Sequence, residues 1–510
     1  MSRLRILLVL FLVVLAVPIL IHPIPFFPDD ALFYPQIAWH IVRGDGSTFN
    51  GIERTNGYHP LQMIATIAVM GLVGGRKLLA LRLGIVVEFL WLGGALMLFY
   101  RLETRRRGVW MVGAGLLSLA YGTGLFGLET HLSLLTIVWW LVRLDLCLCD
   151  PDEPSNWRMF GIASALACLA RLDNVFLVAS GTVIALATDP DAAVRRAIRI
   201  VETAAPPLLV YLVWNLHAYG HLVPISGAIK SSFPHLMMEP RYLGKLGAVV
   251  TIAAVGSLVA SLYRRDWILL ATSMGTLLHA SYVLLFSASP STAMFWYYTV
   301  GVANAALFLD YVELPRLQPA VAAIILILAV GRTWLKACGF NVNPLNPTAV
   351  TQSAPEEPPF RWVKDLLPAD ATMLAAEFPG SLAYFSNQKI VALDGLTNDY
   401  TYDETLSRQR ILAYANRVGA QFYLGPYANP GESIDYWPVL AVGGDRSVLT
   451  RFWSPLSRRD AGTITLPRDA VIQVGNERTF GHGKFALWEL RKLAAPDSLP
   501  ETPASSTPRP

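Results

Sequence analysis

The chain has 510 residues, of which 54% are hydrophobic and 15% are charged, against about 25% charged in a typical soluble domain. Its mean hydropathy of +0.43 excludes a soluble enzyme, a coiled coil and an intrinsically disordered protein for most of its length. The net charge of +4 is too small for a protein whose main partner is a nucleic acid. The four cysteines follow no disulfide-framework spacing. We therefore expect a polytopic α-helical membrane protein.

Apolar runs long enough to cross a membrane as helices recur along the first two thirds of the chain. The first extends from about Leu4 to Ile21 behind a basic head, and no small-residue cleavage site follows it, which favours an anchor over a signal peptide. By the positive-inside rule its N-terminus is cytoplasmic. The sequence predicts about 11 transmembrane helices, the others beginning near Leu78, Val109, His131, Met159, Asn174, Ala197, Gly244, Trp267, Trp296 and Leu317.

The segment Pro60–Gly75 decides the topology, because it is apolar but short. If it spans the membrane, the basic cluster at 101–107 and the later arginines face outward. If it lies in the membrane interface as a half-buried helix, all these arginines face the cytoplasm, as the charge rule requires. We adopt the interfacial helix. The first loop and the C-terminal part then lie on the outer face.

The amino-acid composition changes along the chain and divides it into four regions. Residues 1–335 form the transmembrane part, in which residues 22–60 are an acidic first outer loop, and residues 336–359 are rich in Asn, Pro, Thr and Glu, as in a linker. Residues 360–493 combine short alternating apolar stretches with a helical pattern over 401–418, which predicts an extracytoplasmic α/β domain. The tail 494–510 has a disordered composition.

Two adjacent carboxylates, Asp29 and Asp30, follow the first apolar run. Such a pair at a membrane edge can accept a proton from a hydroxyl group or help to bind a divalent cation. The alternative is structural: Asp29 caps the following helix and Asp30 favours its positive end. No His, Cys and Asp set has metal-site spacing.

Ionisable residues also interrupt later apolar runs. Glu129 lies at the predicted outer end of the third span, Arg171 and Asp173 at that of the fifth, and Lys230 in a later outer loop. Charges at membrane depth are costly and indicate function by default. Arg171 and Lys230 are candidates for binding a lipid phosphate, whereas an ion pair of Arg171 with Glu129 or Asp173 is the structural alternative.

Other polar and aromatic residues complete the predicted cavity. Asn56, Tyr58 and His59 lie in the turn-like segment RTNGYHP, at the mouth of any interfacial cavity, although a histidine there is more often a structural hydrogen-bonding group. Trp296 and Tyr297 belong to an aromatic set typical of the membrane interface, and such rings can also stack on sugars.

The segments PDDALFYPQIAWHIVRGDGSTFNG, TNGYHP, GLET, ARLDN, YGHLVPISGAIKSS and SLAYFSNQKIVALDG resemble the GT-C superfamily of membrane glycosyltransferases. The branch that they resemble uses polyprenyl-phosphate sugars as donors. It includes lipid A aminoarabinose transferases, protein O-mannosyltransferases and mycobacterial terminal arabinofuranosyltransferases, and the order of the GLE, R-x-D and lysine motifs is most similar to the last group.

The resemblance implies a hexosyl- or pentosyltransferase of the bacterial inner membrane that acts at its outer face, with inversion. An acidic residue of the first loop, Asp29 or Asp30, would be the general base, and Arg171 and Lys230 would bind the donor phosphate. The acceptor would be an envelope glycan, lipid or protein. In some relatives the acidic loop binds Mg²⁺ or Mn²⁺; Asp29 and Asp30 would be its ligands here, and we assign no metal.

Two other classes of protein fit part of the pattern. A transporter or flippase for a polyprenyl lipid would need polar residues in the middle of spans, whereas the charges here gather near one face. A non-catalytic lipid-binding protein would keep Arg171 and Lys230 for a phosphate and use Asp29 and Asp30 as helix caps.

Overall fold

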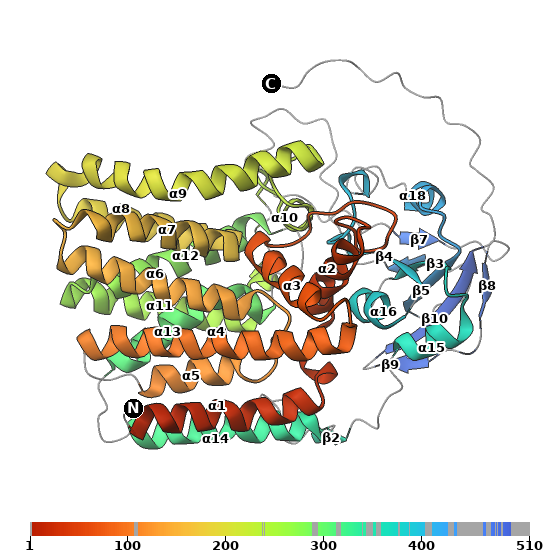
Figure 1. The fold of residues 1–510 in the computed structure, drawn as a ribbon, viewed down its shortest axis with the longest axis horizontal. Coiled ribbons are helices and arrows are strands. Elements are labelled where there is room, and N and C mark those ends of the chain that lie inside the picture. The colour runs from red at the N-terminus through yellow and green to blue at the C-terminus, as the bar shows by residue number, and fades with distance from the viewer. Residues whose placement is uncertain are drawn as a thin grey trace, which may run out of the picture.

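A bundle of apolar helices and a C-terminal domain at one of its ends make up the computed structural model (Figure 1). The structure describes residues 3–106, 111–236, 238, 240–287, 294–312, 318–338, 340–342, 350–352, 359–375, 378–386, 388–402, 411–426, 433–435, 463–465, 471–474, 476, 478–480 and 483–490. The expected tail 494–510 and the middle of the expected helix 401–418 lie outside these residues.

The bundle has a helix at every position where the sequence predicts a span. Six of these helices, α4, α6, α9, α11, α12 and α14, are long and apolar enough to cross a membrane. The chain is therefore a multi-pass membrane protein, and the number of 11 spans stays a prediction. The bundle helices are α1 (Arg3–Ile21), α4 (Lys77–Arg106), α5 (Met111–Tyr121), α6 (Thr130–Cys149), α7 (Pro154–Ala170), α8 (Val175–Ala187), α9 (Pro190–Tyr219), α11 (Gly244–Arg264), α12 (Trp267–Phe286), α13 (Thr299–Tyr311) and α14 (Gln318–Ala337).

Two of the helices begin several residues before the apolar run that predicts them. α7 and α9 both start at a proline, which suits the first helical position because its missing N–H would be unpaired there anyway. The side chains of Glu153 and Asp189 cap them by accepting hydrogen bonds from the N–H groups of Ser155 and Ala192. The capping residues, rather than hydropathy, therefore determine where α7 and α9 begin.

Short helices from two long segments between bundle helices cover one end of the bundle. η1 (Ile24–Phe26), η2 (Asp29–Leu32), α2 (Phe33–Arg43) and α3 (Pro60–Leu72) come from the N-terminal part, and α10 (Ile225–Lys230) follows α9. α2 and α3 lie across this end, between the bundle and the C-terminal domain (Figure 1). α3 is thus a short apolar helix outside the parallel bundle, and its place in a membrane interface stays a prediction.

The C-terminal part is built on a mixed six-stranded sheet. Its order is β4-β3-β5-β10-β8, and β9 also pairs with β10. β4, β3 and β5 are parallel to one another, whereas β10 is antiparallel to β5, β8 and β9. The elements are α15 (Pro359–Leu366), β3 (Thr372–Ala375), α16 (Pro379–Phe385), β4 (Lys389–Ala392), α18 (Ile411–Arg417), β5 (Phe422–Pro426), β8 (Val471–Gln473), β9 (Arg478–Phe480) and β10 (Gly483–Leu490).

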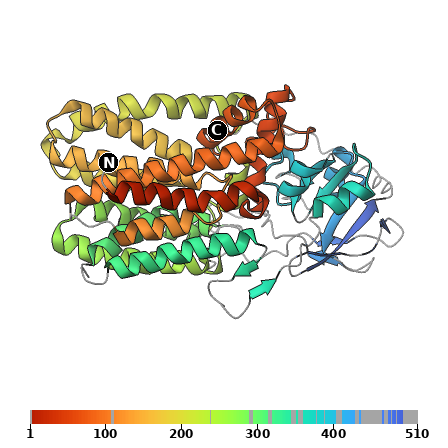
Figure 2. The ribbon, with the colours of Figure 1, turned by 60° about the horizontal axis from the view of Figure 1, so that its bottom comes forward.

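Two smaller strand pairs accompany this sheet. β1 (Phe340–Val342) pairs with β2 (Val350–Gln352) inside the segment expected to be a linker, and β6 (Ser433–Asp435) pairs with β7 (Thr463–Thr465). β1 directly follows α14, and Figure 2 shows this strand pair beside the same end of the bundle as the large sheet. The domain boundaries that the composition predicts stay predictions.

The first loop attaches the C-terminal domain to the bundle through Asp29. The carboxylate of Asp29 accepts hydrogen bonds from the backbone N–H groups of Gly380 and Ser381, both at 2.8 Å. These groups belong to the first turn of α16, whose own preceding residue provides no side-chain cap. A Cβ atom at position 380 would lie 2.0 Å from the backbone oxygen of Asp29, so the close approach requires a glycine there.

Further hydrogen bonds and apolar contacts join the C-terminal domain to this end of the bundle. Lys77 Nζ donates hydrogen bonds to Gln36 Oε1 (2.9 Å) and to the carbonyl of Tyr384 (2.8 Å), while the Tyr384 hydroxyl donates to the Lys77 carbonyl (2.7 Å). Buried side chains of α2, α3 and the large sheet belong to one hydrophobic cluster. The first loop and the C-terminal domain therefore pack as one unit at this end of the bundle.

We expect Asp29→Ala to loosen α16 without affecting the bundle. The N–H groups of the buried Gly380 and the half-buried Ser381 would lose their acceptor, and an unpaired buried group costs about 1–3 kcal/mol. The amides of Gly380 and Ser381 should then exchange with deuterium faster, as measured by hydrogen exchange of the full-length protein. Asp30→Asn is the matched control, and equal exchange in both variants would contradict the capping role.

Candidate active site

A large cavity opens at the end of the bundle that faces the C-terminal domain. Its volume is about 840 Å³, and its walls come from η2, α2, the turn before α6, η3 (Leu172–Asn174), α10, α12 and η6 (Phe295–Tyr298). Most of the wall is apolar. The ionisable side chains that line it are Asp30, Tyr34, Tyr58, His59, Glu129, Arg171, Asp173, Lys230, His279, Tyr282 and Tyr297.

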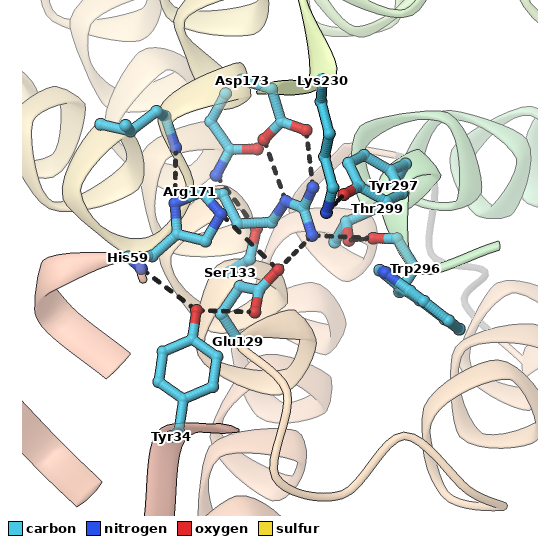
Figure 3. Close-up of polar contacts among 12 residues, drawn as sticks. Tyr34, His59, Glu129, Ser133, Arg171, Asp173, Lys230, Trp296, Tyr297 and Thr299 are labelled. Atoms are coloured by element: carbon cyan, nitrogen blue, oxygen red, sulfur yellow. Dashed lines mark hydrogen bonds and ion pairs between the residues drawn. The ribbon is translucent and has the colours of Figure 1, made fainter. Parts of the chain in front are cut away.

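Arg171 lies at the centre of a buried ion-pair network, with 2% of its surface exposed. Its Nε and Nη2 atoms donate to the two carboxylate oxygens of Asp173, at 2.9 and 2.7 Å. Its Nη1 atom donates to Glu129 Oε1 and to the carbonyl of Trp296, the latter at 3.1 Å (Figure 3). The ion pair that the sequence offered as the structural alternative for Arg171 is therefore present, and Arg171 pairs with both carboxylates at once.

Tyr34 and His59 extend this network toward the first loop. The Tyr34 hydroxyl donates to Glu129 Oε2 at 3.0 Å and accepts from the backbone N–H of His59 at 3.1 Å (Figure 3). His59 Nδ1 accepts from the Leu172 N–H at 3.3 Å, which fixes the ring as a neutral tautomer with its proton on Nε2. Burial accordingly lowers the pKa of His59. The position of His59 is therefore explained by hydrogen bonds that hold the loop.

Lys230 is a further cation that lines the cavity, besides Arg171. It ends α10, which is anchored by the buried Ile225 and Ile229. Its Nζ donates to the Tyr297 hydroxyl at 2.5 Å and lies 5.2 Å from the centre of that ring. The Arg171 guanidinium lies 4.9 Å from the centre of the same ring, so Tyr297 lies beside both cations (Figure 3).

Asn56 positions α10 from outside the cavity wall. Its side-chain oxygen accepts from the Ile225 N–H at 3.0 Å, and its amide nitrogen donates to Asn215 at 3.4 Å. Tyr58 does line the cavity, and its hydroxyl is hydrogen-bonded to Ser47 at 2.9 Å. Of the aromatic set, Trp296 and Tyr297 both line the cavity. The side chain of Phe295 is outside the described residues.

The two adjacent aspartates have different surroundings. Asp30 lines the cavity, whereas Asp29 is directed toward α16 and does not. Burial raises the pKa of Asp30; the charge of Lys230 opposes this rise and that of Glu129 adds to it. Burial also raises the pKa of Asp29, to about 6, against the lowering effect of its two backbone hydrogen bonds. Only one of the two candidates is thus placed to meet a substrate in the cavity.

Tyr34 and His279 are among the polar residues of this site that sequence reasoning missed. Tyr34 carries no distinguishing pattern. His279 Nε2 lies 3.6 Å from Asp173 Oδ2, and the signal for it is an isolated histidine within an apolar run. Within the described part of the chain, no group of three or more His, Cys, Asp or Glu residues is placed to hold a metal ion.

Solved structures share this fold. ArnT from Cupriavidus metallidurans, bound to undecaprenyl phosphate, matches with a TM-score of 0.54 and 13% sequence identity, over 94% of this chain and 97% of that one. The apo state of the same protein matches with a TM-score of 0.51 and 13% identity, over 83% and 93% of the two chains. The oligosaccharyltransferase AglB from Archaeoglobus fulgidus gives 0.47 and 10%, over 78% and 65%.

The chain therefore has the fold of ArnT, which agrees with the resemblance drawn from its sequence. No sequence-family model and no curated protein sequence matches it. The structural likeness to ArnT shows the fold alone.

Proposed function

We propose that the chain is a glycosyltransferase that moves a monosaccharide from a polyprenyl-phosphate donor to a glycan, lipid or protein of the cell envelope. The observation that carries this proposal is the cavity at the bundle end, which combines an acidic side chain, Asp30, with a cation, Lys230, in a GT-C fold. A polyprenyl tail partitions into the bilayer and presents its phosphate at the membrane edge, where this cavity opens in the predicted topology.

Asp30 is the proposed general base. Its carboxylate takes the proton of an acceptor hydroxyl while the hydroxyl oxygen attacks the anomeric carbon of the donor. The bond between that carbon and the phosphate oxygen breaks at the same time, and its electron pair leaves with the polyprenyl phosphate. A direct displacement of this kind inverts the anomeric configuration. The raised pKa of Asp30 strengthens it as a base relative to an exposed aspartate.

Lys230 is the proposed phosphate-binding cation. Its ammonium group faces the cavity, and the charge that develops on the leaving phosphate would be stabilised there. Arg171 has a different proposed role, because its guanidinium is occupied by Glu129 and Asp173. It holds these carboxylates and contributes, beside Tyr297, to the positive side of the cavity.

We expect Lys230→Met to lower kcat/KM for the donor by about 10²–10³-fold, the usual loss when one charge-stabilising group is removed from a reacting centre. Initial rates at varied donor concentration would measure this effect. Lys245→Met is the matched control, because Lys245 is an exposed lysine at the start of α11. Equal rates in the two variants would contradict the phosphate-binding role.

A donor panel tests the function itself. The purified protein, reconstituted in vesicles, would be given undecaprenyl phosphates that carry different hexoses or pentoses, with and without extracts of envelope glycans, lipids or proteins. The proposal predicts release of undecaprenyl phosphate with at least one donor, dependent on an acceptor. Absence of release from every donor, with every acceptor fraction, would contradict it.

A further inference from the structure

A buried ion pair joins two bundle helices close to the candidate active site. Glu88 of α4 is 3% exposed, and His131, in the first turn of α6, is fully buried. Glu88 Oε2 lies 2.9 Å from His131 Nδ1. Both helices are long and apolar enough to cross a membrane, where ionisable groups are costly and indicate function by default. Neither side chain lines the cavity, so a role in the reaction has to act through other residues.

Glu88 and His131 hold the turn between α5 and α6. Glu88 Oε1 accepts a hydrogen bond from the Gly127 N–H at 2.7 Å. His131 Nε2 lies 2.6 Å from the Tyr121 carbonyl oxygen and must donate to it, because a carbonyl can only accept. The Phe126 ring also stacks on the His131 ring, with the ring centres 5.0 Å apart. The backbone of the turn is therefore fixed by side chains of α4 and α6.

This turn is in direct contact with η2, which carries Asp30. Gly127 adopts a φ of +85°, and a Cβ atom there would lie 2.6 Å from the Phe27 ring and 3.0 Å from the Cβ atom of Ala31. Ala31 directly follows Asp30 in η2. A shift of the turn would therefore displace the carboxyl group that is proposed as the base.

A second connection from the turn to the base passes through Glu129. Glu129 ends the turn, and its Oε2 atom accepts a hydrogen bond from the Tyr34 hydroxyl at 3.0 Å (Figure 3). Tyr34 lies four residues after Asp30, and both side chains line the cavity. The Tyr34 hydroxyl in turn accepts from the His59 N–H at 3.1 Å. The position of the turn thus also affects the helix that follows Asp30.

The cations of the cavity are held by other contacts. Lys230 ends α10, whose first N–H group, that of Ile225, donates to the Asn56 side chain at 3.0 Å. Arg171 donates two hydrogen bonds to Asp173, and these do not involve the turn. A shift of the turn should therefore affect the base more than it affects the site of the donor phosphate.

We propose that Glu88 is a positioning residue of the active site, which fixes Asp30 for proton transfer by holding the turn at Gly127. This inference rests on the proposed function. It assigns Glu88 a role in the rate of transfer and not in donor binding.

Glu88→Met tests this role, because methionine fills the space of glutamate but cannot accept the hydrogen bond of Gly127. With a donor that the wild type cleaves, kcat for acceptor-dependent release of undecaprenyl phosphate should fall by about 10²-fold, the usual cost of misplacing a reacting group by about 1 Å. The donor KM should change by less than about threefold. Gly127→Ala should give the same split between kcat and KM, because its Cβ atom forces the turn and η2 apart.

Glu88→Gln is the conservative variant that should restore the rate. Its amide oxygen can still accept from the Gly127 N–H, and its amide nitrogen can donate to Nδ1 of a neutral His131 ring whose proton is on Nε2. We expect kcat of Glu88→Gln to stay close to that of the wild type.

Asp310 provides the matched control for a purely structural effect. It is a fully buried carboxylate of α13 and accepts hydrogen bonds from the N–H groups of Val112 and Gly113, at 3.2 and 3.1 Å. It lies near the end of α13 remote from η6, which lines the cavity. Asp310→Leu should therefore lose stability but keep kcat for each folded molecule.

Hydrogen exchange of the full-length variants gives a readout that does not depend on activity. In Glu88→Met, the amides of Gly127 and His59 should exchange with deuterium faster than in the wild type, because the first loses its acceptor and the second depends on Tyr34 and Glu129. In Asp310→Leu these two amides should exchange as in the wild type.

The outcomes separate this inference from the function on which it rests. A wild-type kcat in Glu88→Met or Gly127→Ala, or an equal loss of kcat in Asp310→Leu, would overturn the positioning role and leave the transferase proposal intact. An equal loss in Glu88→Gln and Glu88→Met would also overturn it, because the charge of Glu88 would then matter instead of its hydrogen bond. A wild-type protein that transfers no sugar from any donor would overturn the proposed function, and this inference with it.

Discussion

Asp30→Asn is expected to reduce the rate of acceptor-dependent donor cleavage by about 10²–10⁴-fold, the usual contribution of a general base. The substitution keeps the size of the side chain but removes the carboxylate that would take the hydroxyl proton. Donor binding should remain or improve, because one negative charge leaves a cavity that must accept an anion. A loss of turnover with binding intact is therefore the expected signature.

Asp29→Asn is the matched control for this experiment. Asp29 precedes Asp30 and has the same chemistry, but its carboxylate is bound to the N–H groups of α16 rather than exposed to the cavity. We expect turnover in Asp29→Asn to stay much closer to that of the wild type. Loss of turnover in Asp29→Asn with activity kept in Asp30→Asn would reverse the assignment of the base.

The pH dependence of the wild type follows from the same assignment. A general base works only when ionised, so kcat/KM should rise with pH as Asp30 loses its proton. Because burial raises the pKa of Asp30, this rise should occur above pH 3.8, the ordinary value for an aspartate. The rise should be absent from any residual activity of Asp30→Asn.

Arg171→Met is expected to cause the largest loss of stability, about 3–5 kcal/mol, which is typical when one partner is removed from a buried ion-pair network. The guanidinium is 2% exposed and joins Glu129 and Asp173, so its removal leaves a buried carboxylate, Glu129, and a half-buried one, Asp173, without their cation. Arg171→Lys should be intermediate, because an ammonium group cannot reproduce the two-pronged contact with Asp173.

Unfolding of the detergent-solubilised variants would measure this loss. Arg195→Met is the matched control, since Arg195 is an exposed arginine of α9. Adding Glu129→Gln and Asp173→Asn to Arg171→Met should recover part of the stability, because the unpaired charges are then absent. Equal stability of Arg171→Met and Arg195→Met would contradict the role of Arg171 in the network.

The helices of the bundle and their positions could be predicted from hydropathy, because apolar runs of span length have few other stable structures. The starts of α7 and α9 could not, because Glu153, Asp189 and the prolines that follow them lie before the apolar runs. The expected linker contains strands β1 and β2, whose pairing depends on residues about ten apart rather than on local composition.

The residue types of the site could be predicted from the sequence, but the contacts between their side chains could not. Asp29 and Asp30 have the same local sequence, and what separates them is α16, which lies about 350 residues further along the chain. The sequence also left Arg171 with two alternative partners, and the fold gives it both.

The most direct test of the central claim follows a sugar-labelled undecaprenyl-phosphate donor in sealed vesicles that contain the purified protein and an active acceptor. The account predicts that the label moves to the acceptor with inverted anomeric configuration, that undecaprenyl phosphate is released in equal amount, and that Asp30→Asn binds the donor without transfer. Movement of intact donor from one leaflet to the other, without cleavage and unaffected by Asp30→Asn, would contradict a transferase and indicate a lipid transporter.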